Sequence, residues 1–143
     1  MLRGALLCAA VSTLLLHAEK KVITPPEFAG SQAPFSPGIL TDGTLYVAGQ
    51  IGQDLKTSKI PDEFEAEVRT CLDRVGLILK AGGMSFSDVV TVNVYLTDID
   101  LFARMNAVYT TFFKPPRPAR TTVGVAKLAA AGAHIEITVT ARK

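Results

Sequence analysis

Residues 62–83 read DEFEAEVRTCLDRVGLILKAGG, and this stretch is the clearest helical pattern of the chain. Asp62 and Glu65 have the spacing of a capping box at a helix N-terminus, and Gly82-Gly83 supplies the glycines that commonly end a helix. Between them, apolar side chains recur every three or four residues and share one face: Phe64, Val68, Cys71, Leu72, Val75, Ile78 and Leu79. A helix with such a face needs a large apolar surface to cover, which points to a sheet.

Strand patterns occur on both sides of this helix. Before it, Asp42-Gly43 separates two β-prone runs within residues 39–47, which predicts a hairpin whose turn residues have positive φ. After it, residues 89–96 are rich in β-branched and aromatic side chains, and residues 120–126 form another strand candidate. Residues 134–141 alternate strictly, with isoleucine, valine and alanine on one face and histidine, glutamate and threonine on the other.

A second helix is expected between these later strands. Asp98 or Asp100 caps it, Pro115-Pro116 stops it, and one side is apolar: Phe102, Met105, Tyr109, Phe112 and Phe113. The order strand, strand, helix, strand, helix, strand, strand predicts an α+β fold with a mixed sheet and both helices packed on one face. The other face then needs a cover that the chain lacks, so we expect a homo-oligomer.

The composition is that of one globular domain. The chain has 143 residues, of which 48% are hydrophobic and 20% charged, and residues 19–143 form a single domain without repeats or linkers. Fifteen basic and thirteen acidic side chains leave a net charge of +2 without a basic run, so we expect no nucleic-acid partner. Cys71 belongs to the apolar stripe and is expected to be an inert thiol. His134 stands alone on a strand, so no metal site is expected.

Residues 1–18 have the layout of a secretory signal peptide. A positively charged start is followed by the apolar run 4–16, and charged residues begin at Glu19. The run is too short to span a bilayer, and Leu7 before Cys8 does not suit a lipoprotein site, so we expect no stable membrane association. If the leader is cleaved, the protein is exported to the periplasm or secreted. An additional N-terminal element or a misassigned start would leave it cytoplasmic.

Two charged residues lie inside strand patterns and are the candidate functional groups. Arg120 opens an apolar strand after Pro118-Ala119, and Glu136 lies between two isoleucines. A guanidinium matches a carboxylate bidentately, and a glutamate can position or activate water as a general base. On these residues alone, a structural ion pair, or a solvent-facing position at a subunit rim, is the simpler account.

Four short motifs follow one another over residues 22–143. They are Gly49-Gln50-Ile51, a helix segment that begins DIDLF at Asp98 and continues through NAVY to FF, Pro118-Ala119-Arg120 and Ile135-Glu136-Ile137. In this order and spacing, the chain resembles the RidA/YjgF family, which is also labelled endoribonuclease L-PSP.

This resemblance implies a chorismate-mutase-like α+β fold, assembled as a homotrimer with ligand sites between subunits. It also implies hydrolytic deamination of enamines and imines of the 2-aminoacrylate type to 2-keto acids and ammonia, without a cofactor. Arg120 matches the family arginine that holds the substrate carboxylate, and Glu136 matches the glutamate that orients the attacking water. Gly49-Gln50-Ile51 matches the loop that lines the pocket. Asn106 matches an asparagine of the family's helix motif, and its role can be either helix packing or ligand contact.

Two candidate substrate-binding positions depart from the family pattern. Phe35 stands where the family has a tyrosine. Thr122 stands two residues after the arginine, where the family has a cysteine. The carboxylate clamp is kept, but polar groups around it are altered. A non-catalytic trimer that binds small carboxylates is therefore the alternative to an imine deaminase. Endoribonuclease activity is a third candidate. The chain has a single His after residue 18, no Trp and a near-balanced charge, so it offers neither an acid–base pair of histidines nor a stacking platform for bases.

Overall fold

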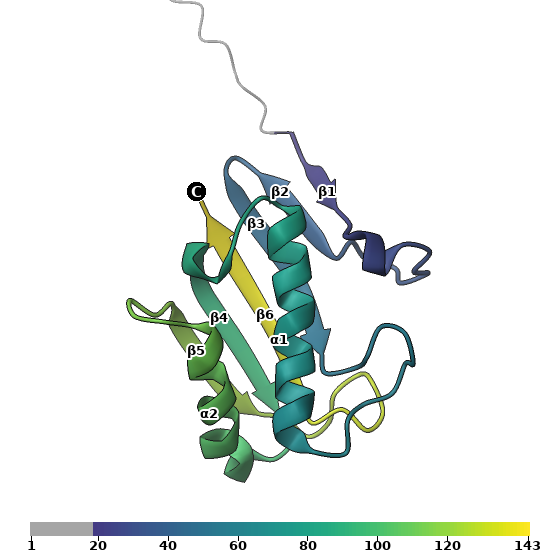
Figure 1. The fold of residues 1–143 in the computed structure, drawn as a ribbon, viewed down its shortest axis with the longest axis vertical. Coiled ribbons are helices and arrows are strands. Elements are labelled where there is room, and N and C mark those ends of the chain that lie inside the picture. Colours follow the sequence, from purple (N-terminus) through teal and green to yellow (C-terminus); the bar gives the residue numbers. More distant parts are fainter. Residues whose placement is uncertain (1–18) are drawn as a thin grey trace, which may run out of the picture.

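The computed structural model describes residues 19–143, so the signal peptide expected over residues 1–18 lies outside the described part. Strands, α-helices and short 3-10 turns (η) form one unit (Figure 1). In chain order they are β1 (Lys21–Ile23), η1 (Pro26–Phe28), β2 (Gly38–Thr41), β3 (Thr44–Ile51), α1 (Phe64–Ala81), η2 (Phe86–Asp88), β4 (Val89–Leu96), η3 (Ile99–Leu101), α2 (Phe102–Phe112), β5 (Ala119–Gly124) and β6 (Ile135–Arg142). Among these residues, no helix is both long and apolar enough to cross a membrane.

The strands form one six-stranded sheet in the order β1-β2-β3-β6-β4-β5. β4 and β5 run parallel with α2 as their crossover, whereas the other neighbouring pairs are antiparallel. Both helices lie on the same face, where α1 packs across β3 and β6 and beside α2 (Figure 1). The predicted α+β architecture, a mixed sheet with two helices on one face, is confirmed.

The body and the C-terminus of α1 match the sequence prediction. All seven apolar residues of the predicted stripe are buried. Gly83 has a φ of 73°, and the amides of Gly83 and Met84 donate to the carbonyls of Lys80 and Leu79. This pair of hydrogen bonds is a Schellman motif, in which glycine takes the left-handed conformation without strain.

The predicted capping box of α1 is wrong. Glu63, not Asp62, occupies the N-cap position, and its side chain accepts no hydrogen bond from the first turn. Glu65 is engaged elsewhere, because both of its carboxylate oxygens accept hydrogen bonds from Arg104 of α2, each 2.6 Å long. These bonds hold the pKa of Glu65 at about 2. The carboxylate therefore joins two helices instead of capping one.

The predicted hairpin at Asp42-Gly43 is confirmed, with φ values of 46° and 68° at its two central residues. Most differences from prediction lie at element ends: β5 spans 119–124 instead of 120–126, and His134 precedes β6. β1 and the 3-10 turns have no counterpart among the predicted elements, because three residues carry too short a pattern to read. Phe102, expected on the apolar side of the second helix, is 39% exposed. Asp98 caps η3, where its side chain accepts the amide of Asp100.

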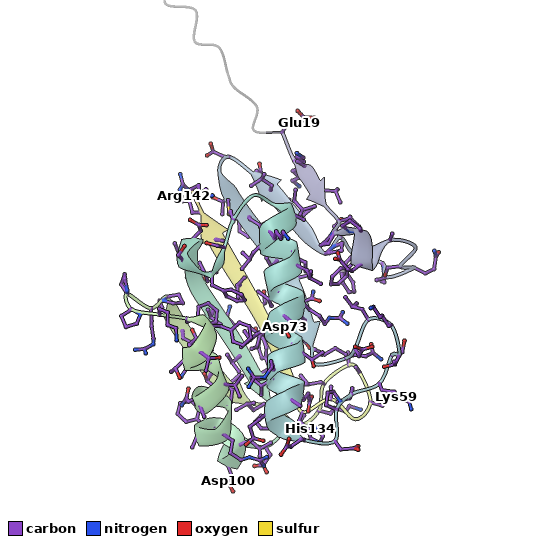
Figure 2. The ribbon with its side chains drawn as sticks, in the orientation of Figure 1. Glu19, Lys59, Asp73, Asp100, His134 and Arg142 are labelled. Atoms are coloured by element: carbon purple, nitrogen blue, oxygen red, sulfur yellow. The ribbon has the colours of Figure 1, made fainter. Side chains whose placement is uncertain are left out.

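Glu67 is a fully buried charged residue that ties α1 to the start of β6. Its Oε1 accepts hydrogen bonds from the amides of His134 (2.7 Å) and Ile135 (3.3 Å). Its Oε2 lies 2.8 Å from His134 Nδ1, and Figure 2 shows His134 beside the N-terminal end of the helix. Helical periodicity places Glu67 near the core but does not reveal its partners, which come from the far end of the chain.

The second face of the sheet has no cover among the described residues. Side chains that alternate with the core point to it, and two of them, Val22 (55%) and Tyr46 (53%), are more than half exposed. Its central part is rich in threonine and carries Glu136. A homo-oligomer was expected because one sheet face would lack a cover, and that face is indeed exposed in the described chain. The homo-oligomer itself stays a prediction.

We expect Glu67→Ala to lower the free energy of unfolding by about 3 kcal/mol, because two backbone amides and the His134 ring lose a buried acceptor. The matched control is Glu65→Ala, which removes a more exposed carboxylate from the same helix and should cost much less. Urea unfolding followed by circular dichroism measures both variants. Equal losses would contradict the anchoring role of Glu67.

Candidate functional site

Arg120 lies near the start of β5, and its guanidinium has no charged partner within residues 19–143. Its register partner on β4 is the core residue Val92, so Arg120 lies on the sheet face that carries the helices. There its guanidinium carbon is 4.5 Å from the ring centroid of Tyr109 and 5.5 Å from that of Phe102. None of the ion pairs among residues 19–143 includes Arg120. The rings hold the cation by cation–π contacts and leave hydrogen-bond donors available for an anion.

A cleft of about 400 Å³ opens beside this guanidinium. It is lined by residues of α2 and of the segment that leads into β5: Asn106, Tyr109, Thr110, Arg117, Pro118 and Arg120. This lining contains two cationic side chains and no acidic one. We call it the arginine cleft, and its charge suits a carboxylate or another small anion.

Two hydroxyl groups near Arg120 are buried without a hydrogen-bond partner in the described chain. They belong to Tyr109 and to Thr122, which lies two residues further along β5 on the same face as Arg120. Burial raises the pKa of Tyr109, although the positive charge of Arg120 opposes this shift. The phenol therefore keeps its proton at neutral pH and remains a donor. Unpartnered buried hydroxyls are costly to a fold and are a reason to look for a ligand.

Glu136 lies in a different cleft, of about 370 Å³, which we call the glutamate cleft. Its lining comes from β3, β4, β6 and the loop after β5: Gly49, Tyr95, Val125, Lys127, Leu128, Ala129, Glu136 and Thr138. β3 bulges near Gly49, where its register against β6 shifts. A Cβ atom at Gly49 would collide with Oε1 of Glu136, so glycine is needed for the carboxylate to lie against the β3 backbone.

The two clefts lie on opposite faces of the sheet. Arg120 pairs in register with Val92 of β4, whereas Glu136 pairs with Tyr95. These two β4 residues are three positions apart, and strand side chains alternate, so they point to opposite sides. β4 also separates β5 from β6. An intrachain ion pair between Arg120 and Glu136, the simpler account on the residues alone, is therefore wrong.

The other predicted site residues are spread over several environments. Asn106 lines the arginine cleft, and Ile51 shares the sheet face of Glu136 by register. Gln50 is only 2% exposed, and its Oε1 accepts a hydrogen bond from Nε of Arg74 beneath α1. Phe35 is 60% exposed in the loop before β2 and is part of neither cleft.

Several cleft residues escaped the sequence analysis, among them Tyr95, Arg117 and Lys127. A signal existed for Tyr95, because strand alternation alone places it on the face opposite the core. Arg117 and Lys127 lie in loops, whose paths no periodic pattern determines. Tyr109 was expected to be buried and is, but the position of its hydroxyl beside Arg120 depends on the packing of α2 against β5.

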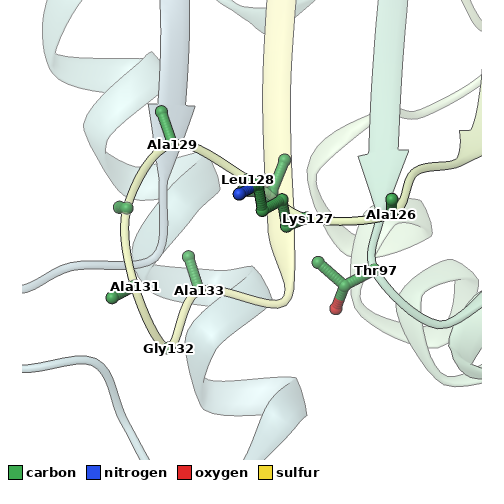
Figure 3. A pocket seen from close by; sticks show the side chains of 9 residues that line it. Thr97, Ala126, Lys127, Leu128, Ala129, Ala131, Gly132 and Ala133 are labelled. Atoms are coloured by element: carbon green, nitrogen blue, oxygen red, sulfur yellow. The ribbon is translucent and has the colours of Figure 1, made fainter.

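One further cavity and the thiol of Cys71 lie apart from Arg120 and Glu136. The loop after β5 surrounds a cavity of about 520 Å³ lined largely by alanine, with Lys127 as its only charged side chain among the described residues (Figure 3). Cys71 is fully buried, its Sγ donates to the carbonyl of Gln50, and burial raises the pKa of the thiol far above its usual range. Among residues 19–143, no group of three or more His, Cys, Asp or Glu side chains could hold a metal ion.

Along most of its length, the chain is similar to proteins of one family. The family model described as Endoribonuclease L-PSP matches residues 27–143. Two curated relatives are the proteins of Rattus norvegicus and Homo sapiens named 2-iminobutanoate/2-iminopropanoate deaminase. Each is 38% identical to this chain over 119 residues, which cover 82% of this chain and 86% of the relative.

Solved structures of related proteins share the fold. RidA from the Antarctic bacterium Psychrobacter sp. is 31% identical, with a TM-score of 0.80 over 86% of this chain and 99% of its own. TdcF of Escherichia coli, solved with bound serine, is 30% identical, with a TM-score of 0.79 over 87% of this chain and 99% of its own. With the matched motifs and the shared architecture, these similarities place the chain in the RidA/YjgF family, also called the endoribonuclease L-PSP family.

Proposed function

We propose that this protein hydrolyses small 2-imino and 2-enamino acids to 2-oxo acids and ammonia, at a site shared by two copies of the chain. The observation that carries the proposal is the unpaired guanidinium of Arg120, held over Tyr109 in a cleft without acidic side chains. An anion-binding group of this kind anchors the carboxylate of a small acid. The names of the rat and human relatives, which specify 2-imino acids, support the same chemistry.

Arg120 cannot reach Glu136 of its own chain, because the two clefts lie on opposite sheet faces. A second copy is therefore needed to bring a glutamate cleft to each arginine cleft. A contact between two different surfaces is heterologous, and heterologous contacts form a closed ring when the rotation between neighbouring copies closes. We propose a homotrimeric ring, in which the uncovered sheet face of one copy meets the arginine cleft of its neighbour.

The proposed reaction needs only water and these side chains. Arg120 binds the substrate carboxylate and so fixes the adjacent imine carbon. Glu136 of the second copy accepts a proton from a water molecule as its oxygen forms a bond to that carbon. The carbon–nitrogen double bond becomes single as Glu136 passes this proton to the nitrogen. The proton of the new hydroxyl then also passes to the nitrogen, the remaining carbon–nitrogen bond breaks, and ammonia leaves as the carbonyl forms. The buried hydroxyls of Tyr109 and Thr122 are available to donate to the substrate.

We expect Arg120→Ala to abolish the acceleration of 2-oxobutanoate and ammonia release when an amino-acid dehydratase generates 2-iminobutanoate in the same solution. The loss of a charge-assisted carboxylate anchor should lower kcat/KM at least about 100-fold. Arg104→Ala is the matched control. It removes an exposed arginine of α2 that binds Glu65 of α1 and lines neither cleft. Failure of the unaltered protein to accelerate the release of ammonia from any small imino acid would refute the proposed activity.

A complementation experiment tests the shared site directly. Arg120→Ala and Glu136→Gln should each be inactive alone, yet a refolded equal mixture should recover about one quarter of the activity, because random assembly pairs an intact arginine with an intact glutamate in that share of sites. Light scattering would measure the mass of the assembly. A mixture as inactive as its components would mean that both groups act within one chain or that the assembly differs.

Binding without turnover is the second candidate function, favoured by Thr122 at a position near Arg120 where the family resemblance predicts a reactive cysteine. It would appear as thermal stabilisation by 2-oxobutanoate in a protein that fails the coupled assay. RNA cleavage, which the family description names, would instead be strongly salt-dependent and would disappear in Glu136→Gln.

The N-terminal segment carries a second proposal, which is independent of the reaction. We propose that residues 1–18 are removed and that the mature protein begins near Glu19 in an extracytoplasmic compartment. Mass spectrometry of the mature N-terminus from native cells tests this. Detection of residues 1–18 in the mature protein would contradict the proposed removal of the leader.

A further inference from the structure

A second arginine shares the arginine cleft. Arg117 lies three residues before Arg120 and lines the same cavity. Its Nε donates a hydrogen bond of 3.2 Å to the carbonyl of Phe113, at the C-terminal end of α2. That bond anchors the side chain by one donor and leaves the two terminal nitrogens of the guanidinium available.

The cleft provides no internal counter-charge for Arg117. Its lining contains no aspartate or glutamate, and none of the ion pairs among residues 19–143 includes Arg117. The Pro118 ring restricts the backbone between the two arginines. Two guanidinium groups that line one cavity repel each other unless an anion lies between or beside them.

One carboxylate satisfies only one of these groups. A 2-imino monocarboxylate presents a single anionic end, which Arg120 takes in the proposed reaction. A substrate with a second acidic group at the other end of its carbon chain would satisfy Arg117 as well. The polar ends of Asn106 and Thr110, which also line the cleft, suit such a polar tail better than an aliphatic one.

We propose that the cleft is built for 2-imino dicarboxylates, with Arg120 on the carboxylate beside the imine carbon and Arg117 on the distal carboxylate. The inference rests on the proposed function and specifies its substrate class. The reaction is balanced as before: water adds to the imine carbon, ammonia leaves, and a 2-oxo dicarboxylate forms. The distal carboxylate takes part only in binding, so Arg117 determines specificity and performs no chemical step.

The test compares two imines that share a four-carbon chain. 2-Iminosuccinate and 2-iminobutanoate, generated in the same solution by amino-acid oxidases from aspartate and 2-aminobutanoate, differ in a terminal carboxylate or methyl group. We expect the full chain to favour 2-iminosuccinate in kcat/KM. Arg117→Met should lower the ratio of the two kcat/KM values about tenfold, the size of one partly exposed charge-assisted hydrogen bond.

Lys114→Met is the matched control. It removes the same charge from a neighbouring exposed side chain that does not line the cleft. The ratio should stay as in the unaltered protein, which separates direct contact from long-range attraction of a dianion. An equal fall of the ratio in both variants, or no preference for 2-iminosuccinate in the unaltered protein, would overturn the inference.

A binding measurement keeps this inference separate from the proposed activity. In titration calorimetry, succinate should bind more tightly than butanoate, and Arg117→Met should remove most of that difference. This result would support the dianion site even if no imine were hydrolysed, whereas equal affinities would overturn it. A change in assembly mass in Arg117→Met would also overturn it, because Arg117 would then be a contact between copies.

Discussion

The alternation of side chains along β4 is the constraint on which the rest of the structure depends. Val92, Val94 and Leu96 point to the helices and are buried, so the residues between them must point to the opposite face. Because β4 lies between β5 and β6, its pleat also sets which side of the sheet Arg120 and Glu136 occupy. The need for a core under two helices thus decides that the two candidate catalytic groups of one chain are kept apart.

Charges in this fold separate into two groups. Glu67 is deeply buried, and its carboxylate oxygens are bonded to backbone amides and to His134, while Glu65 is bonded to Arg104. These pairs hold elements together. Arg120, Arg117 and Glu136 lie in clefts and form none of the ion pairs of the described chain. The charged groups left without an ion pair beside these cavities are therefore the candidates for ligand binding.

The parts that the sequence predicts well are those with a repeating pattern or a fixed turn chemistry. The α1 stripe, the Asp42-Gly43 hairpin and the alternating β6 are confirmed because each is a local property. The N-terminus of α1 does not depend on local sequence alone, because Arg104, far along the chain, binds Glu65, which was expected to complete a capping box with Asp62. The motifs predict Arg120, Glu136 and Gly49 as site residues. They do not predict that Arg120 lies on one sheet face and the other two on the opposite face, because this depends on strand order and register. Arg117 and Lys127 lie on loops and required the structure.

The bulge of β3 beside Gly49 has a consequence for how the family can vary. The carboxylate of Glu136 lies where a Cβ atom at position 49 would be, so any side chain at that position would displace it. The arginine cleft is instead lined by α2 and by the segment that leads into β5. Side chains there can be substituted without disturbing the sheet. Under the proposed function, a change of substrate would therefore come through side chains of the arginine cleft, while position 49 stays restricted to glycine.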